Sequence, residues 1–234
     1  MELMVPRNRD LVDLLSQASS ADLNVLADLI TDFGNGRVAL DKLTMRHILM
    51  HKEIGGLQDI SDVLEREICA FGGNTIANAW RKRGVPYLEL ATDVARKLGV
   101  KQIKELDVFA IEELAIGQAV PSASDGKAVT APRTESELIS VLGTLVSTLV
   151  TNAGTVTGVV AAGGATGAAG LLGGRLVALL APPLAIAAVS ATAFQAASPA
   201  YRITVPAVLQ IAKIRRVQFN IDLAAYHEAV RACI

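Results

Sequence analysis

The stretch TESELISVLGTLVSTLVTNAGTVTGVV, residues 134–160, decides the fold prediction. Thr134 and Glu137 form a Thr-x-x-Glu capping box, in which each side chain accepts a hydrogen bond from the other residue's backbone N–H. A long helix from Glu135 to about Val160 is therefore predicted. Hydroxyl residues recur every three or four positions along it and form a hydroxyl stripe: Ser140, Thr144, Ser147, Thr148, Thr151 and Thr155.

This helix opens an apolar run whose only charged residue between Leu138 and Tyr201 is Arg175. Hydroxyl groups can bond to carbonyls of their own helix, so the stripe is tolerated in lipid and favoured where helices touch. A Pro-Pro pair at 182–183 interrupts the run, and the piece after it is too short alone for a hydrocarbon core of about 30 Å. A hairpin with a kinked second arm is therefore expected over residues 136–198.

Glycines in the apolar run form three pairs with a spacing of four positions: Gly154/Gly158, Gly163/Gly167 and Gly170/Gly174. Small residues at this spacing let two helix backbones approach closely. In water each glycine costs a helix about 0.5–1 kcal/mol relative to alanine, so a flexible Gly-rich loop is the alternative. Arg175 is expected to mark the turn between the two arms or the bilayer surface, unless it forms a salt bridge to an acid in the first half.

Residues 1–118 have the pattern of short helices separated by glycine, and no stretch alternates as a strand would. In the helix that follows Pro86, Leu88 and Leu90 are both expected to face inward. The predicted helices are Asp10–Gln17, from Ser20 or Asp22 to about Gly34, from Thr44 through Leu49, Asp59–Phe71, Thr75–Arg83 after an Asn74 cap, from Pro86 to Leu98, and from Asp107 through Ile116.

The expected fold class is all-α, with an N-terminal bundle of short helices and a C-terminal Ala/Gly-rich helical hairpin. A last helix is expected to start after Pro206 and to run to Arg216. The domains are predicted as an acidic helical domain at 1–118 with an N-terminal module at 1–45, a linker at 119–134, and the hairpin with basic C-terminal helices at 135–234.

The formal net charge of −1 hides an asymmetry between an acidic first half and a basic, apolar second half. Residues 138–234 carry six basic residues and two acids. This excess suits contact with an anionic membrane or with the chain's own acidic half. Lys213, Arg215 and Arg216 follow the apolar run as a cytoplasmic flank would. No nucleic-acid partner is expected, since no basic stripe with interleaved aromatic residues appears.

The two cysteines, Cys69 and Cys233, do not form a disulfide framework, and Cys69 lies on an apolar helix face as a buried thiol would. The first ten residues contain no apolar segment, so a secretory signal is not expected. These features favour a cytoplasmic location or one associated with the inner membrane.

Candidate chemistry is sparse. His47 and His51 stand four apart on a helix, a spacing that can place two imidazoles on one metal ion, but no third ligand is evident. The acid pair Glu112-Glu113 is expected to be exposed on a helix face. No Ser/His/Asp order, P-loop or zinc spacing is present. We therefore expect no catalytic residue and no cofactor, and a protein that is not an enzyme.

Several stretches resemble the YaaW-like bacterial family: NRDL at 8–11, GNGR at 34–37, FGGNTIAN at 71–78 and YRITVPAVLQIA at 201–212. The central part is also similar to the ubiquinol–cytochrome c chaperone family. The resemblance spans most of the chain and implies a bacterial source, but the family's members are largely uncharacterised. It carries over no catalytic residue, and the apolar run is where the chain resembles the family least.

Two functions are expected from these features. The first is a membrane-interacting, self-assembling helical protein whose small-residue hairpin inserts in or packs at the membrane as a pore or scaffold. The second is a soluble chaperone-like or interaction protein whose Ala/Gly run is a homo-oligomer seam or bundle core. The expected partner is a second copy of the chain, in the first function and in the homo-oligomer form of the second.

Overall fold

A computed structural model describes residues 5–36, 40–71, 84–120, 132, 134–160 and 201–233. Over these residues the chain forms helices and loops, without a strand, so the all-α prediction is confirmed. The helices are α1 (Leu11–Ser16), α2 (Ser20–Thr31), α3 (Lys42–Ile54), the 3₁₀ helix η1 (Leu57–Ile60), α4 (Ser61–Phe71), α6 (Tyr87–Lys97), α7 (Val108–Ala119), α8 (Glu135–Val160) and α11 (Tyr201–Ala232).

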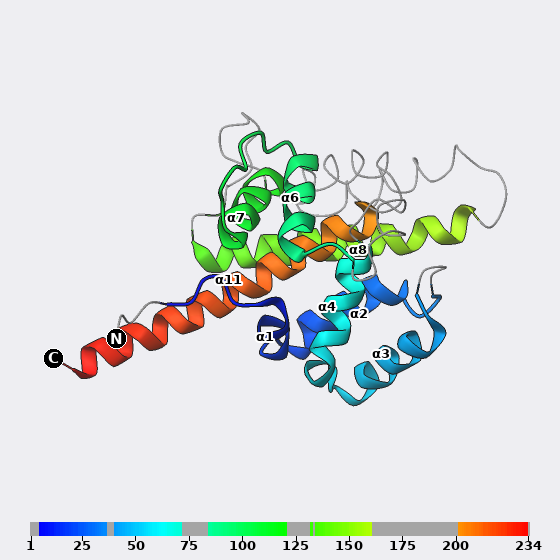
Figure 1. Ribbon diagram of the computed structural model, residues 1–234, viewed down its shortest axis with the longest axis horizontal. Coiled ribbons are helices and arrows are strands. Elements are labelled where there is room, and N and C mark those ends of the chain that lie inside the picture. The colour runs from blue at the N-terminus through cyan, green and yellow to red at the C-terminus, as the bar shows by residue number, and fades with distance from the viewer. Residues whose placement is uncertain are drawn as a thin grey trace.

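The 32-residue helix α11 is the axis of the structure. Figure 1 shows α6 and α7 on one side of it, α1 to α4 on the other, and α8 alongside. Its first half is buried through residues such as Val208, Leu209 and Ile211, whereas the C-terminal end projects beyond the other helices and is mostly exposed. Helices of both predicted domains, 1–118 and 135–234, therefore contribute to one hydrophobic core.

Helix α8 begins where the capping box predicts. The backbone N–H of Thr134 donates to Glu137 Oε2 at 3.2 Å, and the N–H of Glu137 donates to Thr134 Oγ1 at 3.2 Å. Its apolar face packs against α11 through buried residues: Leu142, Leu145, Val146, Leu149 and Val150. Among the described helices, α8 included, none combines the length and apolar character needed to cross a bilayer.

Two helix caps differ from the prediction. The Ser19 side chain, rather than Ser20 or Asp22, accepts from an N–H of the first turn of α2. Helix α3 is capped by Asp41, whose carboxylate accepts from the N–H groups of the following residues at 2.9 and 3.0 Å. These hydrogen bonds lower the pKa of Asp41. The expected cap, Thr44, lies inside the first turn because an Asp three positions earlier serves as well as a hydroxyl.

Two further predictions are wrong. Helix α11 starts at Tyr201 and contains Pro206, because burial of the flanking apolar residues offsets the one backbone hydrogen bond that a proline removes. Leu88 is 45% exposed, since the buried face of α6 is formed by Tyr87, Leu90 and Val94 and Leu88 falls outside that face. The predicted helix Thr75–Arg83 and most of the predicted linker lie outside the described residues.

Candidate functional site

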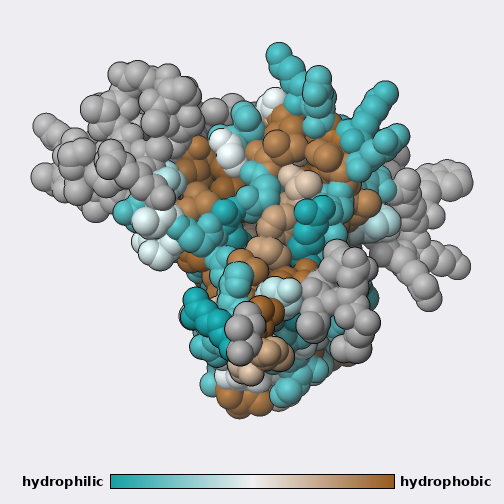
Figure 2. All heavy atoms as spheres, turned by 90° about the vertical axis from the view of Figure 1, so that its left-hand side faces the viewer, coloured by the Kyte–Doolittle hydropathy of each residue, from teal (hydrophilic) through white to brown (hydrophobic). Residues whose placement is uncertain are grey.

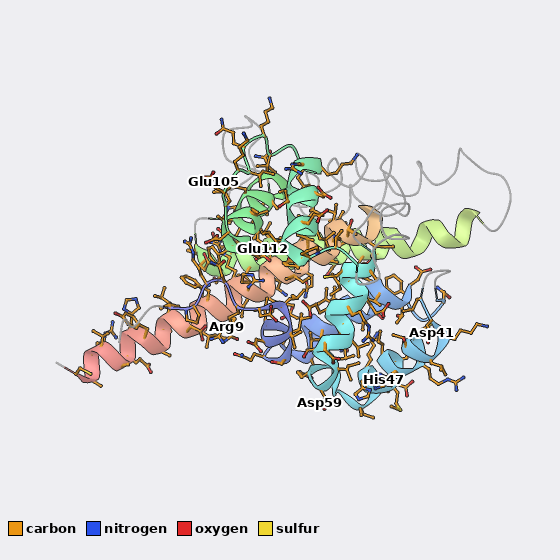
Figure 3. All side chains as sticks on the ribbon, viewed as in Figure 1. Arg9, Asp41, His47, Asp59, Glu105 and Glu112 are labelled. Carbon is orange, nitrogen blue, oxygen red and sulfur yellow. The ribbon has the colours of Figure 1, made fainter. Side chains whose placement is uncertain are left out.

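The most unusual group in the described core is a buried ion pair between α7 and α11. Glu112 and Arg215 each expose 3% of their side chain, and Arg215 Nε lies 2.7 Å from Glu112 Oε2. Figure 3 shows Glu112 where α6, α7 and α11 meet. Charged side chains are almost never buried to this degree unless they are paired. Arg215 and Glu112 therefore join the last long helix to the middle of the chain.

Two further hydrogen bonds complete this group. The Tyr87 hydroxyl donates to Glu112 Oε1 at 2.7 Å, and Arg215 Nη1 donates to the backbone carbonyl of Arg9 at 2.7 Å. Arg9 in turn pairs its guanidinium with Asp222 of α11 at 2.7 Å. We call Tyr87, Glu112 and Arg215 the buried polar centre. It holds α6, α7 and the segment before α1 on the same helix.

Burial governs the protonation of this centre. Loss of hydration raises the pKa of Glu112 to about 7, and the attraction of Arg215 only partly opposes that rise. Burial also raises the pKa of the Tyr87 phenol, and the neighbouring Glu112 carboxylate adds to the rise. The phenol is therefore a hydrogen-bond donor throughout the neutral range, while Glu112 exchanges its proton near neutrality.

The other cations in this part of α11 are paired as well. Lys213 Nζ lies 2.7 Å from Asp22 Oδ1, and Gln210 donates to the same oxygen at 2.9 Å. Burial opposes ionisation of Asp22, but the hydrogen bonds from its neighbours prevail and lower its pKa. Arg216 forms ion pairs with both Glu113 and Glu135. The hydrogen bonds and charges of these partners raise the pKa of Arg216 beyond its usual range.

These contacts supply one of the two partners expected for the basic residues that follow the apolar run. Lys213, Arg215 and Arg216 bind the chain's own acids, and all but Glu135 of these acids belong to residues 1–118. A buried or half-buried carboxylate attracts the cation more strongly than a screened lipid surface does. Contact of these residues with an anionic membrane stays a prediction.

Comparison with known proteins identifies the family. The chain is 30% identical over 226 residues to the UPF0174 protein YaaW of Escherichia coli O157:H7, with 88% of this chain and 93% of that protein covered. The match to YaaW of Escherichia coli strain K12 has the same identity and coverage. The chain belongs to the YaaW family. No family model and no solved structure matches it.

Membership of the YaaW family confirms the resemblance on which the sequence analysis relied. The likeness of the central part to the ubiquinol–cytochrome c chaperone family stays a prediction. The names of the two YaaW proteins state no activity, so the side chains of this family member carry the evidence on its function.

The hydroxyl stripe lies on the outer face of α8 in this YaaW-family chain. Thr144, Thr148 and Thr151 donate to the carbonyls of the residues four positions earlier, at 3.0, 2.8 and 2.8 Å. Ser140 and Thr144 are exposed, as are Ser147 and Thr151. These three threonine hydroxyls are thus satisfied within their own helix.

The histidines of α3 lie together without completing a metal centre. The His47 and His51 rings meet edge to face with centroids 4.4 Å apart, and His51 Nδ1 lies 3.0 Å from the His47 carbonyl oxygen. Over the described ranges, no group of three or more His, Cys, Asp or Glu side chains is arranged to hold a metal ion.

The remaining predicted packing residues lie wholly or partly outside the described part. Gly154 and Gly158 fall within the last turns of α8, where only the backbone is described, and the side chain of Thr155 is not. The following fall outside the described residues altogether: Gly163, Gly167, Gly170, Gly174 and Arg175.

The expectation of an exposed Glu112 is wrong. Glu112 is buried, while its neighbour Glu113 is half-buried. A signal was present: Glu112 stands four positions from both Val108 and Ile116, on the apolar face of α7. Cys69, by contrast, is a buried thiol as predicted, and burial raises its pKa to about 12.

Proposed function

We propose that this protein is a membrane-interacting, self-assembling helical protein whose small-residue hairpin enters or packs at a bilayer, as a pore or a scaffold. The observation that carries the proposal is the antiparallel pairing of α8 with α11. Glu135 at the start of α8 bonds to Arg216, and a Cβ placed on Gly143 would lie 3.7 Å from the end of the Lys213 side chain, so the two helices run in opposite directions, as Figure 1 shows. The chain thus leaves α8 at Val160 and re-enters α11 at the same end of the pair.

The composition of the intervening segment supports this proposal. Residues 161–200 contain Arg175 as their only charge and are rich in alanine, glycine and leucine. Both ends of the segment are attached to helices anchored in the core. An apolar segment whose two ends join a folded body at the same side can insert into a membrane as a hairpin while the body stays outside it. The self-satisfied hydroxyls of α8 add a neighbouring face that tolerates lipid or a second helix.

The internal ion pairs indicate which force drives membrane binding in this proposal. Because Lys213, Arg215 and Arg216 are neutralised by acids of the same chain, they contribute little attraction to anionic lipid. Burial of apolar surface is then the main driving force for binding. The protein is accordingly expected to bind neutral bilayers nearly as well as anionic ones, with little dependence on salt.

Flotation with liposomes tests the proposal. The full chain is expected to float with both neutral and anionic vesicles, and the double variant Ala168→Lys/Ala188→Lys is expected to lose most of this binding. A lysine near the centre of a bilayer costs about 2.5–3.5 kcal/mol. Ala225→Lys, on the exposed end of α11, is the matched control and should float like the wild type.

A soluble interaction protein is the second candidate, and the tight apolar seam between α8 and α11 favours it. In that case the Ala/Gly run is the core of a homo-oligomer. A wild-type chain that stays out of the floating fraction with both vesicle types would reject the first function. A discrete oligomer in light scattering without detergent that Ala168→Lys/Ala188→Lys disrupts would establish the second.

A further inference from the structure

Helix α3 has two apolar faces, and the fold uses one of them. Ile48 is fully buried, and Met45 packs against the core from the same side. On the opposite side Leu43 is 73% exposed, Met50 51% and Ile54 71%. A helix at the surface of a folded body normally presents polar residues there. The second apolar face of α3 is therefore not explained by the packing of this chain.

The three exposed residues form a continuous stripe together with the half-buried His47. Leu43, His47, Met50 and Ile54 recur every three or four positions and so lie above one another along α3; we call them the α3 stripe. Figure 3 shows His47 on this helix, at the edge of the body, and Figure 2 shows hydrophobic surface at the lower tip, where α3 gives way to η1. A scattered exposed leucine needs no explanation, but this spacing is the pattern by which helices dock on one another.

Charges beside the α3 stripe indicate what covers it. Arg46 and Glu53 are exposed on the same flank, seven positions apart, and neither has an ion-pair partner within the described residues. By contrast Lys52, which points to the inner side, pairs with Asp28 of α2. The flank thus offers one positive and one negative charge at opposite ends of the stripe.

Such a surface is complementary to itself. When two copies of α3 pack antiparallel about a two-fold axis between positions 49 and 50, Arg46 of each copy faces Glu53 of the other, and Leu43 approaches Ile54. Parallel two-fold packing would instead place this flank of the two copies on opposite sides of the contact, where Arg46 of one copy does not meet Glu53 of the other. Two-fold symmetric contacts of this kind are the commonest in protein oligomers.

We propose that α3 is a homodimer contact, in which two copies of this chain join their α3 stripes antiparallel. The surface that covers the α3 stripe belongs to a second copy of this chain rather than to another protein. The reason is that turning the stripe end to end brings Glu53 opposite Arg46 and Arg46 opposite Glu53. This surface is separate from the apolar run between α8 and α11 and adds to the self-assembly of the proposed function. Its failure would leave liposome flotation unchanged, so the two proposals are tested independently.

Charge reversal in the full chain tests the pairing. Arg46→Glu and Glu53→Arg each place two like-charged pairs across the two-fold axis, and each is expected to raise the dimer dissociation constant about tenfold or more. The combined Arg46→Glu/Glu53→Arg variant restores opposite charges and should return the constant to near the wild-type value. Sedimentation equilibrium gives the three constants. A combined variant as weak as the single ones would overturn the proposal.

Cysteine cross-linking tests whether the two copies of α3 pack antiparallel. In a Cys69→Ala/Cys233→Ser background, Met50→Cys lies beside the axis and should cross-link to itself on oxidation. Leu43→Cys should not, because its two copies would lie about 20 Å apart along the helices at 1.5 Å per residue. A mixture of Leu43→Cys with Ile54→Cys chains should give the mixed dimer. Efficient Leu43 self-cross-linking, or no cross-link at any position in a chain that unfolds cooperatively, would reject the antiparallel dimer.

Discussion

An Arg215→Met variant is expected to lose about 3–5 kcal/mol of unfolding free energy at pH 8. At this pH the carboxyl of the folded chain, with its pKa of about 7, is largely ionised beside Arg215. The methionine keeps the apolar stem but leaves the buried Glu112 carboxylate without a counter-charge and the Arg9 carbonyl oxygen without the donor Arg215 Nη1. Uptake of a proton by the carboxyl does not remove the cost at pH 8, because the carboxyl of the unfolded chain is ionised at that pH. Urea unfolding followed by circular dichroism measures the loss.

Glu112→Gln and the double variant Glu112→Gln/Arg215→Met are the matched controls. Glu112→Gln should cost less than Arg215→Met, since burial favours an uncharged side chain at position 112 and Arg215 keeps its bond to the Arg9 carbonyl. The double variant should unfold within about 1 kcal/mol of the wild type, because an apolar side chain and a neutral amide replace the pair. A larger loss for Glu112→Gln than for Arg215→Met would show that the fold depends on the negative charge of Glu112 more than burial allows.

The wild type and the double variant Glu112→Gln/Arg215→Met together report the protonation of Glu112. Its folded-state pKa of about 7 lies above the ordinary value of 4.5, so the folded state binds more protons between these limits. The wild-type unfolding free energy should therefore fall, relative to that of the double variant, as the pH rises from about 4.5 to about 7. Carboxyls common to both proteins cancel in this difference. A relative rise over the same interval would mean that the attraction of Arg215 outweighs burial.

The second large effect is expected at Gly84, which has a φ of +70°. A Cβ at this position would lie 2.8 Å from the Cys69 carbonyl oxygen and 3.0 Å from the Ala70 nitrogen, and backbone atoms cannot move aside as a side chain can. Left-handed strain costs an alanine about 1–2 kcal/mol and overpacking about 1–3 more. Gly84→Ala should therefore lower the unfolding free energy by about 2–5 kcal/mol in a urea titration.

Gly55→Ala separates the two contributions. Gly55 has a φ of +73°, but a Cβ there would meet nothing within 4 Å. Its substitution should cost only the left-handed strain of about 1–2 kcal/mol. Equal losses at the two glycines would exclude close contact with the backbone of α4 as the cause of the Gly84 effect.

Local signals in the sequence predicted the helices well. The Thr134–Glu137 capping box locates the start of α8 because both hydrogen bonds lie within four consecutive residues. The cap of α2 was less certain, since Ser19, Ser20 and Asp22 all carry the required acceptor. Pro206 gave the wrong start for α11, because a local rule about proline cannot register how strongly the surrounding residues are buried.

The sequence did not predict the buried polar centre because its residues are far apart along the chain. Burial of Glu112 depends on Arg215, which is 103 positions away, and on Tyr87 from a third helix. Period and composition place Glu112 on an apolar face, but a lone acid on such a face has two readings: a surface charge at its border or half of a buried pair. Only the packing of α7 against α11 decides between them. The charge asymmetry of the two halves was the sole hint of these long-range pairs.

Depth-resolved fluorescence tests the membrane proposal most directly. In the Cys69→Ala/Cys233→Ser background, an environment-sensitive NBD label is attached at Ala168→Cys or Ala188→Cys in the apolar run, or at Ala225→Cys as the exposed control. On addition of neutral vesicles, the labels at 168 and 188 should shift to the blue and be quenched by spin labels on the lipid chains but not by aqueous iodide, while the label at 225 should stay accessible to iodide. Labels at 168 and 188 that remain open to iodide, without any quenching from the lipid, would show that the run does not enter the bilayer.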